Sequence, residues 1–264
     1  MIEMLSYSFM QNALIISAFS VLICALAGTL AVVNRTVYIT GGVAHASYGG
    51  IGLALFAGIS PTLGAMAVAV VMGVILGIIK ERHSEKTDAV VSGLWAAGMA
   101  AGIILSDITP GYSVDFLSYL FGNILLLSRG DILLAAIFAA VLLAVVIKYY
   151  RTLLVCSADQ EYASTLGINV RKVNIALLLL LCASVIVLMR VAGLILVMAL
   201  LSIPASIAET YSKRLSKMML VSGIVAAIAI FGGLIASVYL NLTPSAVIVA
   251  LLALMYLVNI GIKR

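Results

Sequence analysis

Long apolar runs, separated by short polar and charged segments, follow one another along almost the whole of this chain. About 20 helical residues cross the hydrocarbon core of a bilayer. On that scale the apolar runs predict nine membrane spans, at roughly residues 9–33, 42–59, 61–80, 89–107, 131–149, 172–190, 193–209, 216–240 and 244–262. A further run, Phe116–Leu127, is too short to cross and is interpreted as a re-entrant or interfacial helix. Pro204 falls inside a span, where we expect it to kink or break the helix.

Composition supports the same class of protein. Hydrophobic residues make up 64% of the 264 positions and charged residues only 9%, whereas soluble domains carry about 25% charged residues. The unbroken apolar runs exclude the alternating pattern of a membrane β-barrel. We therefore predict an all-α polytopic membrane protein with eight or nine transmembrane helices, forming a single transmembrane domain over residues 1–264.

The basic residues predict the orientation in the membrane. If the N-terminus lies outside and the C-terminus in the cytoplasm, 13 of the 15 basic residues fall on the cytoplasmic side, and Arg129 and Arg190 remain outside. The net charge of +5 is then explained by orientation and by attraction to lipid headgroups. A nucleic-acid partner is not implied.

The longest cytoplasmic loop contains the signals of a short helix of about ten residues, at about 157–168. Ser157 is predicted as the N-cap of a capping box with Gln160, and Asp159 and Glu161 place negative charge in the first turn. Gly167 supplies a C-cap. Because so short a helix is marginal alone, we expect either an interfacial helix resting on lipid or a docking element for a cytoplasmic partner.

His45 is the histidine that lies inside an apolar stretch, within the glycine-rich run Gly41–Gly52. An ionisable ring is costly to bury in a membrane and points to function. Two interpretations remain: a neutral ring hydrogen-bonded to a carbonyl of a neighbouring helix, or a transient ligand or gate residue on a translocation path. Ser47 is a second candidate for the path, but it lies about 200° around the helix from His45, so the two should not act together.

The acidic residues offer few further candidates. Asp107, Asp115 and Asp131 fall on the predicted outer side, where they could attract cations or be ordinary solvated acids. Glu209 lies at the end of a span, where it could pair with Lys213 or make a contact near the cytoplasmic exit. Asp88 is expected at a helix start, where its charge favours the helix dipole. The cysteines, Cys24, Cys156 and Cys182, show no pairing or metal spacing.

Several stretches, in their order and spacing, carry a family likeness. They are Ala44-His45-Ala46-Ser47, residues 114–125 (VDFLSYLFGNIL), residues 160–163 (QEYA) through 167–170 (GINV), and residues 191–194 (VAGL) through 203–205 (IPA). On these residues the chain resembles the membrane-spanning permeases of zinc/manganese/iron-type ABC importers over nearly its whole length.

The resemblance implies a homodimeric permease on which two cytoplasmic ABC ATPases dock and to which an extracytoplasmic metal-binding protein delivers cargo. It implies that the helix around Ser157–Gly167 is the coupling helix. It also implies a prokaryotic cell (inner) membrane as the location. Family members usually carry an acidic residue one helical turn before the histidine, and Gly41 stands there instead. We therefore expect His45 to act on the path or gate and to hold metal only transiently, with no stably bound cofactor.

The predicted function is the permease subunit of an ATP-driven importer of zinc, manganese or iron, with ATP hydrolysis in a separate partner. The chain is not expected to be an enzyme, since it has no Walker A loop and no His-Glu-x-x-His motif. The alternative is a secondary transporter driven by an ion gradient. That class usually needs intramembrane acidic relays and inverted repeats, and neither is detected here.

Overall fold

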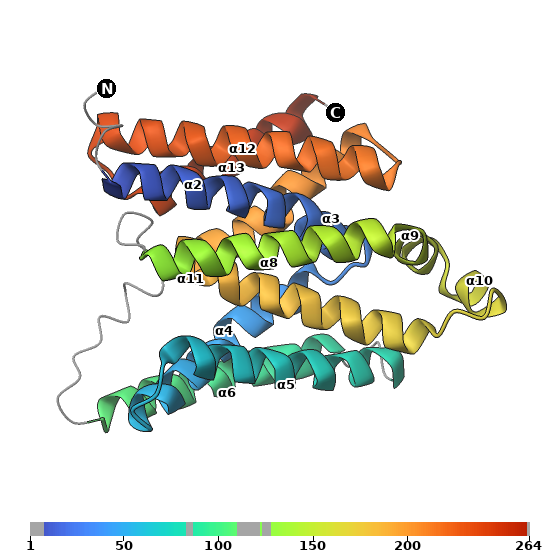
Figure 1. The fold of residues 1–264 in the computed structure, drawn as a ribbon, viewed down its shortest axis with the longest axis horizontal. Helices are drawn as coiled ribbons and strands as arrows, with labels where there is room; N and C mark the ends of the chain where they lie inside the picture. The colour runs from blue at the N-terminus through green and yellow to red at the C-terminus, as the bar shows by residue number, and fades with distance from the viewer. Residues whose placement is uncertain (1–7, 83–86, 110–121, 123–127, 263–264) are drawn as a thin grey trace. The chain divides into compact units, whose positions relative to one another are not determined.

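The computed structural model describes residues 8–82, 87–109, 122 and 128–262, and every regular element in these ranges is a helix (Figure 1). In chain order the elements are α2 (Ser8–Ile23), η1 (Cys24–Gly28), α3 (Thr29–Val33), α4 (Val37–Phe56), α5 (Pro61–Arg82), α6 (Thr87–Asp107), α8 (Arg129–Lys148), α9 (Tyr150–Ala158), α10 (Gln160–Thr165), α11 (Val170–Tyr211), α12 (Leu215–Leu240) and α13 (Pro244–Ile262). The predicted all-α class is confirmed. The short run expected as a re-entrant helix, Phe116–Leu127, lies outside the described residues apart from Gly122.

Seven helices in the described part of the chain are long and apolar enough to cross a membrane. They correspond to the expected spans, with two differences. The 42-residue α11 covers two of those spans, 172–190 and 193–209. The 20-residue α4 corresponds to the expected span 42–59 but is not among the seven; it ends at Phe56 and is about 30 Å long, close to the thickness of the hydrocarbon core. The protein is therefore a polytopic helical membrane protein, as predicted.

The first span departs from regular α-helix in its middle. Between α2 and α3 the five residues of η1 form a π-helix, and all five are buried. At its end, a Cβ atom placed on Gly28 would lie 2.8 Å from the carbonyl oxygen of Leu201. Such π-helical turns inside α-helices are often found at functional positions. Here the turn ends at a glycine that allows backbone from α11 to approach closely.

A glycine, rather than the proline, interrupts α11. Gly193 has φ 75° and ψ 168°, a conformation that residues with a side chain rarely adopt. The break falls between the expected spans 172–190 and 193–209 and confirms that boundary. The expectation at Pro204 was a kink or a break: no break is found there, because the non-helical torsions recorded within α11 are those of Gly193 alone, and a kink stays a prediction. Membrane helices tolerate proline where their surroundings satisfy the freed backbone groups, and Pro204 is buried inside its helix.

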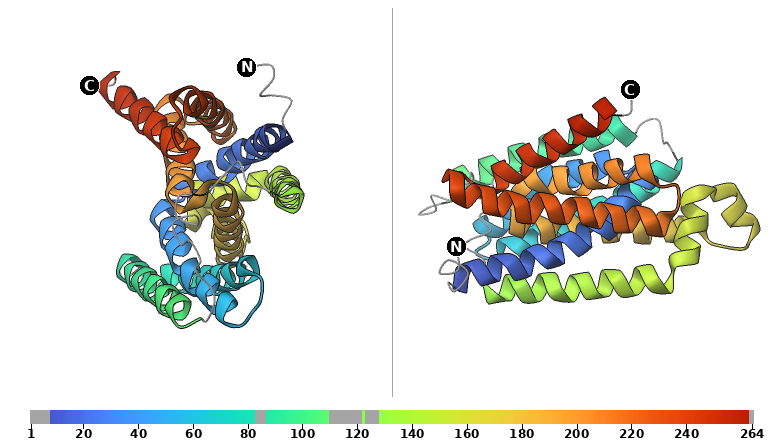
Figure 2. Two further views of the ribbon diagram at one scale, coloured as in Figure 1. Left: turned by 90° about the vertical axis from the view of Figure 1, so that its left-hand side faces the viewer. Right: turned by 90° about the horizontal axis from the view of Figure 1, so that it is seen from above.

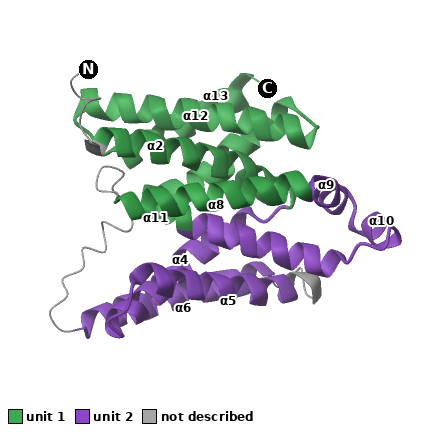
Figure 3. Ribbon diagram, in the orientation of Figure 1, with its two compact units in different colours: residues 1–34, 117–148, 187–264 green, residues 35–116, 149–186 purple. Residues whose placement is uncertain are grey.

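The chain divides into two compact units, which Figure 3 shows in different colours. Unit 1 comprises Met1–Asn34, Leu117–Lys148 and Val187–Arg264, and unit 2 comprises Arg35–Phe116 and Tyr149–Ile186. In unit 1, α12 packs on α13, α2 and η1, and α2 also contacts α8. In unit 2, α4 packs against both α5 and α6, and these three helices lie side by side (Figure 2). That residues 1–264 form one permease domain stays a prediction.

Candidate functional site

The helices α4 and α6 of unit 2 run parallel, with their backbones in contact. Gly49 lies against Gly98 and Gly52 against Gly102, so the residue numbers rise together along both helices. A Cβ atom placed on Gly49 or Gly52 would come 2.9 or 2.7 Å from a carbonyl oxygen of α6. Small residues permit this close approach between membrane helices. The glycines that surround His45 in the sequence therefore hold α6 directly against α4.

A polar contact joins the same two helices near their N-terminal ends. The hydroxyl of Tyr38 on α4 is hydrogen-bonded to the hydroxyl of Ser92 on α6. Ser92 also lies 2.9 Å from the carbonyl oxygen of Asp88, to which its hydroxyl can donate. Asp88 lies in the first turn of α6, as expected, where a negative charge is favourable.

His45 is half-buried on α4 and faces α6. Its Nδ1 lies 2.9 Å from the carbonyl oxygen of Gly41, one turn earlier on the same helix. Since a carbonyl oxygen can only accept, we assign the proton of the neutral ring to Nδ1, which leaves the lone pair on Nε2. One of the two sequence-based interpretations placed this carbonyl on a neighbouring helix. It is instead provided by α4 itself, because the helical repeat brings residue 41 beneath the ring.

The imidazole of His45 stacks on the indole of Trp95. The two ring centroids are 4.1 Å apart and the ring planes are tilted by 34°. The indole Nε1–H donates to the sulfur of Met99, 3.1 Å away and one turn later on α6. Trp95 was missed in the sequence analysis, although it is the single tryptophan of the chain. Its partner could be recognised only once the register of α4 against α6 was known.

Ser47 is fully buried, and its hydroxyl donates to the carbonyl oxygen of Val43 at 2.7 Å. This bond is local to α4 and lies away from the face that His45 presents to Trp95. The expected separation of Ser47 from His45 is consistent with it.

The loop after α8 contains two helices rather than one. Ser157 and Ala158 belong to the last turn of α9, so the prediction of Ser157 as the N-cap is wrong. The N-cap of α10 is Asp159, which has extended backbone torsions and whose carboxylate accepts from the amide of Tyr162 at 3.0 Å. Gln160 is then the first residue of α10, and the expected helix of about ten residues is six residues long.

The C-terminal end of α10 is formed as predicted. Gly167 has φ 77°, its amide donates to the carbonyl oxygen of Ser164, and the amide of Ile168 donates to that of Ala163. These two bonds make a Schellman motif, which needs glycine at the left-handed position. The capped helix is short and mostly exposed, and Glu161, Tyr162 and Leu166 are all accessible on it.

The remaining acidic candidates do not gather at one place. Asp107 is exposed at the end of α6, and Asp115 lies outside the described residues. Glu209 is exposed near the end of α11. Among the described residues no ion pair joins Glu209 to Lys213, because the helix ends at Tyr211 and position 213 lies beyond it. In the described ranges, no group of three or more His, Cys, Asp or Glu side chains is placed to hold a metal ion.

Asp131 is engaged in an ion pair rather than free to attract cations. In unit 1, its Oδ1 lies 2.7 Å from Nη2 of Arg190. Its Oδ2 accepts from both the amide and the hydroxyl of Ser128, at 3.0 and 2.7 Å, which makes a capping box at the start of α8. The Ser-x-x-Asp spacing was visible in the sequence, but the distant arginine was not.

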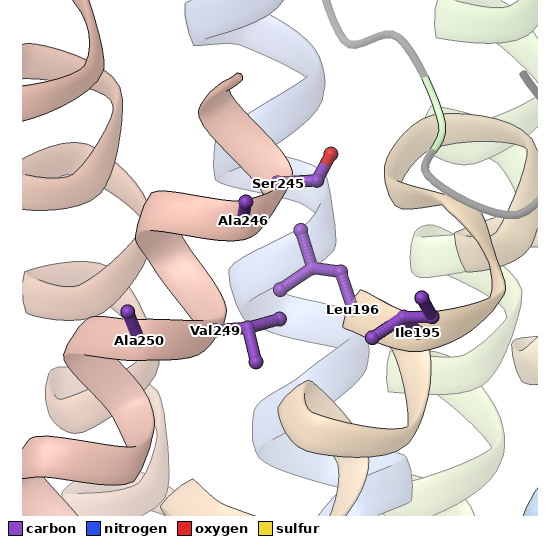
Figure 4. Close-up of a pocket in the computed structure, with 6 residues that line it drawn as sticks. All are labelled: Ile195, Leu196, Ser245, Ala246, Val249 and Ala250. Atoms are coloured by element: carbon purple, nitrogen blue, oxygen red, sulfur yellow. The ribbon is translucent and has the colours of Figure 1, made fainter. Parts of the chain in front are cut away.

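Other polar groups lie among apolar side chains of unit 1. A groove of about 250 Å³ runs between α11 and α13 and is lined by Ile195, Leu196, Ser245, Ala246, Val249 and Ala250 (Figure 4). The hydroxyl of Ser245 is buried there without a hydrogen-bond partner among the described residues. Near the other end of α13, the buried Asn259 lies 3.2 Å from the hydroxyl of Thr210 and accepts from it. A polar residue inside an apolar run was the available signal for Asn259.

The chain is similar in sequence and in fold to known membrane proteins. Residues 6–263 match the ABC 3 transport family. The chain is 37% identical over 264 residues to an uncharacterized membrane protein of Synechocystis, covering 100% of this chain and 94% of that protein. It is 29% identical to the manganese transport system membrane protein MntC of Halalkalibacterium halodurans, over 94% of this chain and 85% of that one. Among solved structures, PsaBC from Streptococcus pneumoniae in complex with Fab matches with a TM-score of 0.86 and 27% identity, over 98% of this chain and 93% of that chain.

Proposed function

Because the chain belongs to the ABC 3 transport family, whose members are membrane permease subunits of metal-ion ABC transporters, we propose that it carries a divalent transition-metal ion inward at the expense of ATP hydrolysed by a partner. The proposed cargo is zinc or manganese, with iron as the third candidate. The name of the relative from Halalkalibacterium halodurans supports manganese. The ion is cargo, and it is held by the permease only in passing.

The observation that carries this proposal is the capped helix α10. It lies beyond the ends of α4, α5 and α6 in its own unit (Figure 3), and it is fixed at both termini by Asp159 and Gly167. Tyr162 and Leu166 are 56% and 54% exposed, one turn apart, with the acidic Glu161 beside them. An ordered helix that leaves apolar side chains exposed next to an acidic one suits a protein partner. Its lack of basic residues argues against a purely lipid-bound helix.

We propose that α10 seats in a cytoplasmic ATPase and transmits its ATP-driven closure as alternating access. The test is uptake of radioactive manganese or zinc into cells that express the intact transporter. Deletion of Gln160–Thr165, or Glu161→Ala, should abolish uptake while the protein remains in the membrane. Ser157→Ala is the matched control, since Ser157 precedes the cap. Normal ATP-dependent uptake after the deletion would overturn the coupling role.

ATP dependence itself separates this proposal from a transporter driven by an ion gradient. In vesicles that contain the reconstituted complex, uptake should follow ATP on the cytoplasmic side and should persist when a proton gradient is collapsed by an ionophore. Uptake driven by a proton gradient without ATP would favour the secondary transporter instead.

His45 is proposed as the path or gate residue that contacts the cargo transiently through Nε2. Neutral imidazole is an ordinary ligand of first-row divalent metals, and hydrogen-bonding of Nδ1 to a backbone carbonyl is the usual support of such a ligand. His45→Ala should reduce uptake while the complex with the ATPase still assembles. Ser47→Ala tests the second path candidate separately. Unchanged uptake in His45→Ala would remove His45 from the path.

The wider assembly follows from the same proposal. Two copies of this permease would associate with two ATPase subunits and receive metal from an extracytoplasmic metal-binding protein, in the cell (inner) membrane of a prokaryote. The N-terminus would lie outside and the C-terminus in the cytoplasm. Asp107 and Asp115 would then attract cations near the outer entrance, and Glu209 would lie near the cytoplasmic exit.

A further inference from the structure

The contact between His45 and Trp95 joins the candidate path residue to a second helix. The imidazole has one nitrogen committed to the Gly41 carbonyl and one ring face against the indole, at a centroid distance of 4.1 Å. Nε2 has no hydrogen-bond partner among the described residues. The ring is therefore held by its helix at one edge and by Trp95 on one face, with Nε2 left available.

Trp95 is itself held in place. Its Nε1–H donates to the Met99 sulfur at 3.1 Å, which fixes the rotation of the indole about its side-chain bonds. The helix that carries it cannot move away freely, because Gly98 on the next turn lies against the backbone of Ala46. A Cβ atom on Gly98 would come 2.6 Å from the Cα of Ala46, so there is no side-chain layer between the helices at this point.

From this geometry we propose that Trp95 is a positioning residue for His45: its indole holds the imidazole in the one orientation that presents Nε2 to the cargo. The inference rests on the proposed role of His45 in transport. A histidine side chain on a helix has several allowed rotamers, and the bond to Gly41 alone constrains only one edge of the ring. Trp95 contributes the second constraint, and the Met99 sulfur accepts from its indole N–H.

The inference predicts a graded series of variants. Trp95→Leu removes the aromatic face, and because aromatic pairs contribute about 0.5–1.5 kcal/mol, the ratio of correctly oriented His45 to its other rotamers should fall roughly two- to tenfold by the same energy scale. Trp95→Phe keeps an aromatic face and should restore most of the activity. Met99→Leu removes the acceptor of the indole N–H while keeping both His45 and Trp95, and it should have an intermediate effect. Gly93→Ala is the control on the same helix, since a Cβ atom there meets nothing within 4 Å.

Two measurements separate positioning from simple packing. The first is the apparent KM for manganese or zinc uptake in cells that express the intact transporter. Trp95→Leu should raise KM with little change in the amount of assembled complex, and it should add nothing in a His45→Ala background. A Trp95→Leu effect of equal size in the presence and absence of the imidazole would overturn the inference, even if His45→Ala confirms the path role.

The second measurement does not depend on transport. The chain has two histidines, so His83→Gln leaves His45 as the sole one for nitrogen-15 labelling. The spectrum of the purified protein should show a protonated Nδ1 and a bare Nε2, and ring protons of His45 shifted upfield by the indole. Trp95→Leu removes the upfield shift in any case, because the indole is gone, and should in addition mix the two tautomers. Unchanged nitrogen-15 shifts of His45 in Trp95→Leu would overturn the positioning role. Changed nitrogen-15 shifts together with normal uptake in His45→Ala would overturn only the proposed path role.

Discussion

Oδ1 of Asp131 lies 2.7 Å from Nη2 of Arg190, and this ion pair ties the first turn of α8 to α11 within unit 1. The Asp131 side chain is 11% exposed and that of Arg190 is 32% exposed, so neither charge is fully hydrated. The free-energy cost of breaking this pair should therefore be intermediate. It should exceed that of a surface salt bridge, which contributes little, and be smaller than that of a fully buried one.

Asp131→Asn should destabilise the protein by about 1–3 kcal/mol, because it leaves a partly buried guanidinium without a counter-ion. The measurement is the thermal unfolding midpoint of the detergent-solubilised protein. Adding Arg190→Gln to Asp131→Asn should recover part of the loss, since the uncompensated charge disappears. Asp107→Asn, at an exposed acid, is the control and should leave the midpoint unchanged. An equal loss in the double variant would mean that the charge pairing is not the cause.

The contact of α4 with α6 can be tested with two alanine variants on one helix. Gly98→Ala puts a methyl group into the backbone of Ala46 and should cost about 1–3 kcal/mol, the usual cost of overpacking. Gly93→Ala fills open space on the same helix and should be neutral or stabilising by up to about 1 kcal/mol. Both are measured as thermal unfolding midpoints. Similar behaviour of the two variants would contradict the backbone contact.

The N-cap of α10 should be Asp159 and not Ser157. Asp159→Ala removes the acceptor for the Tyr162 amide and should weaken the helix by about 1 kcal/mol, which amide hydrogen exchange at Tyr162 would report as faster exchange. Asp159→Asn keeps an acceptor oxygen and should restore most of the protection. Ser157→Ala should leave exchange at Tyr162 unchanged. Faster exchange in Ser157→Ala instead would restore Ser157 as the cap.

Cys156 should be a slow-reacting thiol. It is buried on α9, and burial raises the pKa of this thiol above its ordinary value. A raised pKa leaves less of the reactive thiolate at any given pH. Alkylation of Cys156, followed by peptide mass spectrometry, should therefore be slow near neutral pH. The reference is the exposed cysteine introduced by Leu166→Cys, whose alkylation should accelerate at a lower pH than that of Cys156. Equal rates at the two positions would show that α9 does not shield Cys156.

The spans were predictable because bilayer thickness fixes the length of an apolar helix. The expected spans 131–149 and 244–262 agree closely with α8 and α13. The π-helix η1 had no local signal in the sequence, and it ends at Gly28, where Leu201 approaches from a distant part of the chain. In α11, Pro204 carried the stronger local signal for a helix break, yet the break lies at Gly193. Gly122, with φ 64°, packs against the backbone of Gly193.

The candidate site was predictable only in part, for a related reason. His45 stands out locally, as an ionisable ring in an apolar run. Trp95 does not, because a tryptophan in a membrane segment has many ordinary roles and its stacking partner is set by the register of two helices. At α10 the sequence contained two residues able to cap a helix, two positions apart, Ser157 and Asp159. Helix α9 continues through Ser157, so Asp159 is the residue that has extended backbone torsions and caps α10.

The atom that fixes the proton on His45 belongs to the main chain of Gly41. Substitution at position 41 changes the side chain there but keeps the carbonyl oxygen, because every residue has a main-chain carbonyl. The acceptor for Nδ1 of His45 is thus supplied by the helical repeat itself, whichever residue stands at position 41. Substitutions at position 41 can alter what surrounds the imidazole, including the charge beside it, without removing this acceptor.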